Sequence, residues 1–124
     1  MRPVASPSFA HAPPAGFVRV GLSADLPQLE GRTVTVAGRR IAVFRTEHGL
    51  RAIDAECPHM GGPLGDGLVA GSCVTCPLHG LRIDLESGTA VAGGNGRVAV
   101  HEALELDGEL WLRPAVEPVL VRAA

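Results

Sequence analysis

The stretch Cys57-Pro58-His59-Met60-Gly61-Gly62-Pro63-Leu64 and its shorter counterpart Cys76-Pro77-Leu78-His79-Gly80 are the most specific feature of this 124-residue chain. Each stretch offers one thiol and one imidazole, and sixteen residues separate His59 from Cys76. Thiolate sulfur and imidazole nitrogen are ligands for both zinc and iron. The proline after each cysteine stiffens its loop and removes a backbone donor that would need a partner. The pattern therefore predicts two loops that share one metal site.

Around these loops the sequence alternates between short apolar segments and turns. Within 40–45, Ile41 and Val43 should face one way, and Ala42 and Phe44 the other. Asp107-Gly108 is a strong signal for a tight hairpin. Ser23 could cap a single helical turn before Pro27. Because turn signals recur about every 8 to 12 residues, we expect an all-β sandwich or barrel. The expected strands are 32–36, 40–45, 50–55, 68–69, 72–75, 81–85, 98–100, 105–106 and 109–112.

Composition and charge argue against some classes of partner. The chain has 16 Gly and 10 Pro but only four aromatic residues, and its formal net charge is −2. Neither a basic patch nor an apolar segment of about 20 residues is present, so nucleic-acid and membrane partners are not expected. Three cysteines without a secretory leader predict a cytoplasmic protein with reduced thiols. We expect a Pro/Ala-rich disordered tail over 1–16, one domain over 17–114 and a C-terminal extension over 115–124.

The paired motif, C-x-H followed by C-x2-H with a proline after each cysteine, resembles the Rieske family over roughly residues 17–114. The resemblance implies an antiparallel β-sandwich or barrel with two loops at its tip that bind a [2Fe–2S] cluster. It implies that Cys57 and Cys76 bind the inner iron, and that His59 and His79 bind the outer iron. We also expect the glycines of these loops to let the backbone come close and to offer N–H groups to the cluster sulfurs. These glycines are Gly61, Gly62 and Gly80.

Zinc is the main alternative to an iron–sulfur cluster. Cys73, Cys76 and His79 have a spacing that superficially suits a tetrahedral zinc site. However, Cys57-x-His59 is too tight for the usual zinc knuckle, and the odd offset of Cys73 from Cys76 should place them on opposite faces of a strand. We expect Cys73 to be a core residue instead of a zinc ligand. His11, His48 and His101 have no ligand partner in the sequence and are expected to be structural or solvated.

The resemblance also predicts the reduction potential. High-potential Rieske proteins join their loops by a disulfide at positions that are Gly62 and Leu78 here, and they place Ser and Tyr hydroxyls where this chain has Leu81 and Ile83. Hydrogen bonds to the sulfurs favour the reduced cluster, so their loss lowers the potential. We expect a value near the low end of the Rieske range, about −150 mV.

Two low-potential subfamilies fit the sequence. Segments 36–45, 61–67 and 81–88 are most similar to the small subunit of NAD(P)H-dependent nitrite reductase, whose large subunit reduces nitrite to ammonium. The alternative is a free Rieske ferredoxin of an aromatic-ring dioxygenase system, although such ferredoxins usually have a Pro-rich loop where Gly93-Gly94-Asn95-Gly96 stands here. A third possibility is a non-redox subunit in which the metal only stabilises the fold. In either redox role we expect no turnover by the chain alone.

The redox partner should dock at the loop tip, because electron transfer needs short distances. The partner would be the nitrite reductase large subunit, or a reductase or oxygenase. The sequence suggests an apolar rim there, formed by Met60, Pro63, Leu64, Leu78 and Leu81.

Overall fold

The computed structural model describes residues 13–58, 61–78 and 80–115, and the regular secondary structure in this part of the chain is almost entirely β-strand. No helix within these ranges is long and apolar enough to cross a membrane. The strand content confirms the all-β fold class that the turn spacing predicted. The elements are β1 (Val18–Leu22), η1 (Ser23–Asp25), β2 (Gly31–Val36), β3 (Arg39–Thr46), β4 (Gly49–Asp54), η2 (Leu64–Asp66), β5 (Leu68–Ala70), β6 (Cys73–Thr75), β7 (Arg82–Asp84), β8 (Ala90–Ala92), β9 (Val100–Leu106) and β10 (Glu109–Arg113).

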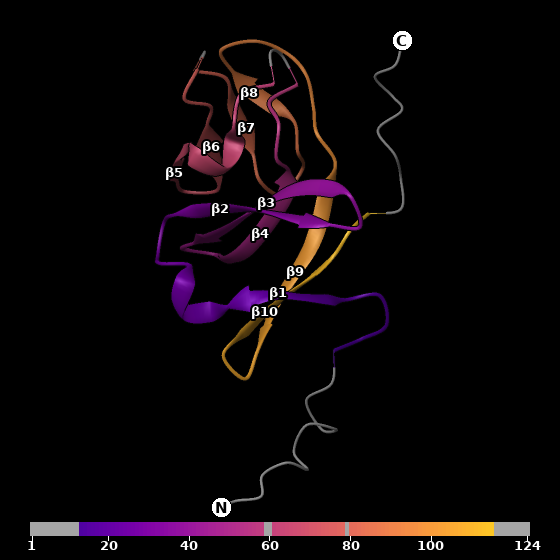
Figure 1. The fold of residues 1–124 in the computed structure, drawn as a ribbon. Coiled ribbons are helices and arrows are strands. Elements are labelled where there is room, and N and C mark those ends of the chain that lie inside the picture. The colour runs from indigo at the N-terminus through magenta and orange to yellow at the C-terminus, as the bar shows by residue number, and fades with distance from the viewer. Residues whose placement is uncertain (1–12, 59–60, 79, 116–124) are drawn as a thin grey trace, which may run out of the picture.

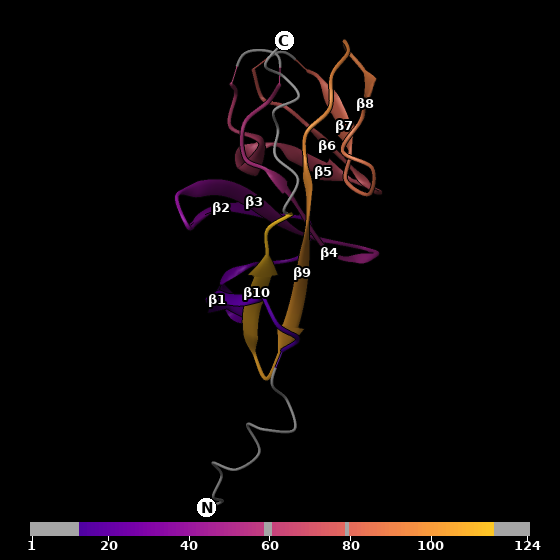
Figure 2. The ribbon, with the colours of Figure 1, turned by 90° about the vertical axis from the view of Figure 1, so that its right-hand side faces the viewer.

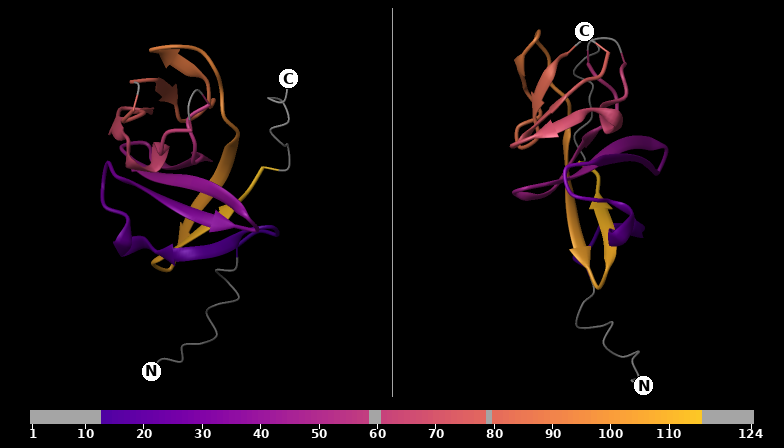
Figure 3. Two further views of the ribbon diagram at one scale, coloured as in Figure 1. Left: turned by 45° about the horizontal axis from the view of Figure 1, so that its top comes forward. Right: turned by 90° about the vertical axis from the view of Figure 1, so that its left-hand side faces the viewer.

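The strands form two antiparallel sheets. The larger sheet has the order β1-β10-β9-β4-β3-β2, and the smaller sheet has the order β5-β6-β7-β8. The larger sheet curls until its two outer strands, β1 and β2, come into contact. Figure 1 shows the smaller sheet above the larger one, and Figure 2 shows the chain descending from the smaller sheet into β9. The two views of Figure 3 show the same division into an upper and a lower part.

Strand β3 is buried on both faces and separates two hydrophobic cores. Ile41 and Val43 belong to a lower core inside the curled sheet, whereas Ala42 and Phe44 belong to an upper core beneath the smaller sheet. The alternation expected for this segment is therefore confirmed. The upper core consists of Ala42, Phe44, Ile53, Ala55, Cys57, Leu64, Val74, Cys76, Leu81, Ile83, Leu85 and Val98.

Two tight hairpins connect neighbouring strands of the larger sheet. Ala37 and Gly38 have φ angles of 52° and 81°, and Asp107 and Gly108 have φ angles of 50° and 80°. Two successive residues with positive φ match the two-residue hairpin turn that suits the twist of the flanking strands. The hairpin expected at Asp107-Gly108 is confirmed by the pairing of β9 with β10.

Some expected boundaries were wrong. The expected strand 98–100 is not a strand of its own, since β9 begins only at Val100. Val98 instead donates its N–H to the Gly88 carbonyl at 2.8 Å and places its side chain in the upper core. Ser23 lies inside the turn η1 and does not cap it, because the N-cap residue is Leu22.

Candidate metal centre

The first predicted metal loop is closed by two backbone hydrogen bonds around Cys57. The Cys57 N–H donates to the Gly62 carbonyl at 2.8 Å, and the Cys57 carbonyl accepts from the Gly61 N–H at 2.9 Å. Gly61 has φ 72°, a conformation that favours glycine. An isolated bridge between Glu56 and Pro63 closes the base of the loop.

The second loop repeats the same frame around Cys76. The Cys76 N–H donates to the Leu81 carbonyl at 2.8 Å, and the Cys76 carbonyl accepts from the Gly80 N–H at 3.1 Å. Gly80 has φ 74°, close to that of Gly61. In each loop the cysteine carbonyl accepts from the N–H four positions later, and the cysteine N–H donates to the carbonyl five positions later. The backbone around the two cysteines therefore has the same hydrogen-bond pattern.

The N–H groups of Gly61 and Gly80 donate to the Cys57 and Cys76 carbonyls within their own loops. Their expected contacts with the cluster sulfurs stay a prediction. The two glycines therefore shape the loops. The predicted imidazole ligands, His59 and His79, lie outside the described residues.

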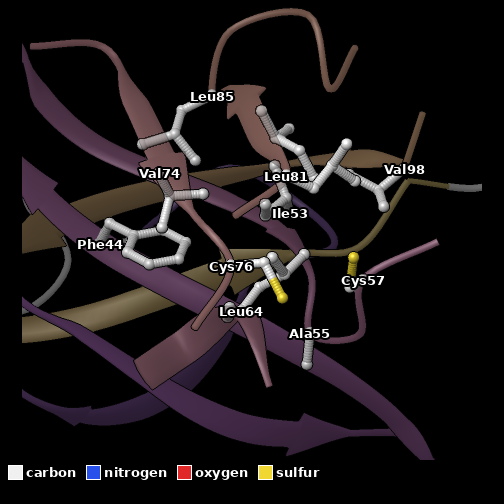
Figure 4. Close-up of a cluster of buried hydrophobic side chains, with 12 residues drawn as sticks. Phe44, Ile53, Ala55, Cys57, Leu64, Val74, Cys76, Leu81, Leu85 and Val98 are labelled. Atoms are coloured by element: carbon white, nitrogen blue, oxygen red, sulfur yellow. The ribbon is translucent and has the colours of Figure 1, made fainter. Parts of the chain in front are cut away.

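The two cysteine side chains meet at one end of the upper core. Cys57 is 3% exposed and Cys76 is 1% exposed. Figure 4 shows both sulfur atoms at the same side of this core, although they come from different loops. A Cβ atom on Gly62 would lie 2.7 Å from the Cys76 sulfur, so only glycine leaves room there. Two buried thiols at one end of an apolar core fit an iron–sulfur cluster, because the core shields the sulfur ligands from solvent.

The surroundings of the cysteines provide no side-chain hydroxyl at the two positions that matter for the potential. Leu81 and Ile83 are both fully buried in the upper core. A Cβ on Gly62 would lie 3.1 Å from the Leu78 side chain, so these two positions are neighbours across the loops. They are the positions that a disulfide would join in a high-potential Rieske protein, and here the contact is between glycine and leucine.

A third loop contacts both metal loops, and its contribution was not foreseen. Gly93 has φ 82°, and a Cβ there would lie 2.6 Å from the Gly80 carbonyl oxygen. Gly96 has φ 129°, and a Cβ there would lie 3.0 Å from the Pro58 ring. The run Gly93-Gly94-Asn95-Gly96 was the available signal, but a glycine run alone does not say which segment it approaches.

The expected apolar rim is only partly present. Leu64 and Leu81 are fully buried in the upper core and cannot contact a partner. Leu78 is 58% exposed, and Pro63 is half-buried. Met60 lies outside the described residues. The prediction of an apolar rim was wrong for Leu64 and Leu81, because the loops direct these two side chains inward, into the core that contains the cysteines.

Cys73 lies on the outer face of β6, as the odd offset predicts. Val74 and Cys76 belong to the upper core, while Cys73 is half-buried and lies outside it. The expectation that Cys73 is a core residue was therefore wrong. Within the described ranges, no three His, Cys, Asp or Glu side chains are grouped to hold a metal ion. The zinc alternative also requires His79, which lies outside these ranges.

His101 is buried in a polar network far from any ligand role. Its Nε2 lies 2.8 Å from Asp54 Oδ1, and its Nδ1 accepts the Ala115 N–H at 2.8 Å. Arg39 donates to the Ala115 carbonyl at 2.7 Å. Burial acts to raise the pKa of the Asp54 carboxyl, but hydrogen bonds from His101 and the Ala99 N–H, together with Arg39, hold this pKa below its ordinary value. The network structurally ties β3, β4 and β9 to the segment after β10, whereas His48 is exposed and His11 lies outside the described residues.

Residues 16–102 match the Rieske [2Fe-2S] domain family. The chain belongs to this family. The Rieske [2Fe–2S] cluster is therefore its cofactor, and its general role is electron transfer. The cluster accepts and returns one electron, and the protein supplies its ligands, its shielding and its surroundings.

The named relatives that the chain matches are larger proteins, and the chain spans about a fifth of their length. A cholesterol 7-desaturase of Xenopus laevis is 39% identical over 106 residues, which cover 84% of this chain and 22% of the relative. The oxygenase component of a 3-ketosteroid-9-alpha-monooxygenase of Mycobacterium tuberculosis is 35% identical over 83 residues, covering 66% of this chain. This chain matches 19% of that relative's length.

Solved structures of similar size share the fold. The ferredoxin of carbazole 1,9a-dioxygenase from Nocardioides aromaticivorans has a TM-score of 0.74 and 25% identity, covering 82% of this chain and 100% of the ferredoxin. A Mycobacterium tuberculosis protein named as an NADH-dependent nitrite reductase small subunit has a TM-score of 0.72 and 22% identity. The match covers 81% of this chain and 96% of that subunit.

Proposed function

We propose that the chain is a low-potential Rieske electron carrier in which Cys57, His59, Cys76 and His79 hold the cluster. The observation that supports the low potential is the apolar surface around the buried thiols. Leu81 and Ile83 fill the upper core without a hydroxyl group, and Leu78 lies beside Gly62 where a disulfide would raise the potential. With no such donors to stabilise the reduced cluster, its potential should lie near about −150 mV.

The specific role that we propose is the small subunit of an NAD(P)H-dependent nitrite reductase, located in the cytoplasm. The third loop supports this role, since Gly93 and Gly96 pack against the two metal loops at the place where dioxygenase ferredoxins usually have proline. The subunit would pass electrons within the complex and would have no turnover of its own.

A free ferredoxin of an oxygenase system is the second candidate. The observation that favours it is the similarity to a free ferredoxin, since the carbazole 1,9a-dioxygenase ferredoxin is 25% identical with a TM-score of 0.74, while the nitrite reductase subunit is 22% identical with a TM-score of 0.72. In this role the chain would accept electrons from a reductase and deliver them to an oxygenase.

Electron paramagnetic resonance of the dithionite-reduced protein tests the carrier function, with iron and zinc quantified on the same sample. We expect the rhombic signal of mixed Cys/His ligation, two irons per chain and a potential below about +100 mV. One bound zinc with no signal would refute the electron-transfer role. Reconstitution with a nitrite reductase large subunit, and separately with a reductase and oxygenase pair, then distinguishes the two roles by electron delivery.

A further inference from the structure

We propose that Arg82 and Arg97, with the exposed strand β8 between them, form a docking surface for an acidic electron-transfer protein. The inference depends on the proposed carrier function, because the surface matters only if the cluster exchanges electrons. The surface lies beside the metal loops, and its positive charge determines the charge of the partner that it would bind.

The two arginines lie on opposite sides of β8. On one side, Arg82 of β7 pairs with Ala92. On the other side, the Ala90 N–H donates to the Gly96 carbonyl at 2.9 Å, and Arg97 forms an isolated bridge with Thr89. Both arginines are exposed, and Val91 between them is 55% exposed. The result is an apolar side chain flanked by two cationic ones.

This surface is next to the metal loops. Arg82 directly follows Leu81, whose carbonyl accepts the Cys76 N–H. Arg97 directly follows Gly96, which packs against Pro58 of the first loop. Figure 1 shows β8 and the segment after it at the same end of the molecule as the two loops. A protein bound here would lie beside the cluster.

The two guanidinium groups differ from the other arginines in the described part of the chain. Arg82 and Arg97 form no ion pair or hydrogen bond with any residue described there. The nearest carboxylate in sequence to Arg82, Asp84, accepts the Glu86 N–H and the Ser87 hydroxyl instead. The arginines with an ion pair are Arg19, Arg39, Arg40, Arg45, Arg51 and Arg113, and Arg32 donates to the Asp25 carbonyl.

The three exposed large apolar side chains described in this upper part are more exposed than the three of the lower part. Leu68, Leu78 and Val91 are 77%, 58% and 55% exposed, more than Val18, Leu22 and Leu29 of the lower part. Protein interfaces combine an apolar centre with charged groups that set orientation and partner choice. Planar guanidinium groups pair well with carboxylates in such interfaces. The chemistry therefore suits a partner with carboxylates around its own redox centre and disfavours a basic one.

Stopped-flow kinetics with a reduced plant-type [2Fe–2S] ferredoxin, an acidic protein, tests the surface. One electron passes from the ferredoxin cluster, which is oxidised, to the Rieske cluster, which is reduced, and no bond or proton changes. At low ionic strength, Arg82→Glu and Arg97→Glu should each lower the second-order rate constant by at least about threefold, because attraction becomes repulsion. The wild-type rate should fall as salt is added, and Arg82→Lys and Arg97→Lys should largely retain it.

Arg32→Glu is the matched control, since it makes the same charge change on an exposed arginine of β2. If Arg32→Glu slows the reaction as much as the two variants do, or if they react at the wild-type rate, the docking surface is refuted. Oxidation of the reduced protein by basic cytochrome c should become faster in both variants. If instead the wild-type protein accepts no electron and shows no cluster signal, the carrier function itself is wrong.

Discussion

Leu64 and Leu78 belong to the same pair of metal loops but lie in opposite environments. Leu64 is fully buried in the upper core, whereas Leu78 is 58% exposed. Leu64→Asp should lower the free energy of unfolding by at least about 3 kcal/mol, because it leaves a cavity and buries a carboxylate without a partner. Leu78→Asp should change it by less than about 0.5 kcal/mol. Urea unfolding followed by circular dichroism measures both, and equal losses would contradict this assignment of burial.

Cys73 and Cys76 offer a similar comparison for the cofactor. Cys76 is buried in the upper core, and Cys73 lies outside it on the other face of β6. We therefore expect Cys73→Ser to keep two irons per chain and the rhombic EPR signal, and Cys76→Ser to lose both. Iron analysis and EPR spectra of the two purified variants test this expectation. Loss of iron in Cys73→Ser would revive the site formed by Cys73, Cys76 and His79.

At the scale of elements, local chemistry predicted the strands that have strong periodicity. Strand β3 was predictable because alternate residues enter different cores, and the turn at Asp107-Gly108 because its φ angles suit those residue types. The cysteines of the two metal loops were also evident from the sequence. These features depend on neighbours within a few positions, which is the range over which sequence patterns are informative.

Other elements depend on distant segments and could not be predicted in this way. Strand β1 has alternating apolar residues at Val18, Val20 and Leu22, but its burial does not follow this alternation, and its register against β10 is irregular. The inward position of Leu64 and Leu81 follows from how the loops close over the upper core. Likewise, only the fold shows that Gly93 approaches Gly80.

The third loop has a steric requirement that links it to the second metal loop. Gly93→Ala would place a Cβ 2.6 Å from the Gly80 carbonyl oxygen, so the second metal loop would have to move. Gly71→Ala is the control, because Gly71 also has positive φ but nothing lies near its added Cβ. We expect Gly93→Ala to lose visible cluster absorbance several-fold faster in the presence of a chelator. Equal rates of cluster loss in the two variants would show that positive φ, and not the contact, is what matters.

At the scale of the whole molecule, Asp54 connects β4 to β9 and to the segment after β10. Because its pKa is lowered in the folded state, the unfolded chain binds more protons near the ordinary value of 3.8. The stability that Asp54 provides is therefore present above that pH and is lost as the pH falls through the folded-state pKa. Asp54→Asn should reduce the free energy of unfolding at pH 7 by about 1–3 kcal/mol.

The difference between Asp54→Asn and the wild-type protein should shrink in acid, as urea titrations at a series of pH values would show. Asp66→Asn is the control, since Asp66 is exposed. A difference that stays constant down to pH 3 would mean that the charge of Asp54 contributes nothing.

The two cores differ in whether they are complete without iron. The lower core consists of aliphatic side chains alone, while Cys57 and Cys76 are members of the upper core. We therefore expect a newly made chain to be able to fold its larger sheet before the cofactor arrives, and the cluster to complete the upper half. For the cell, such an order would let iron–sulfur assembly proteins act on a chain that is already partly folded. Oxidative loss of the cluster should then leave a protein that can be reloaded, and not an aggregate.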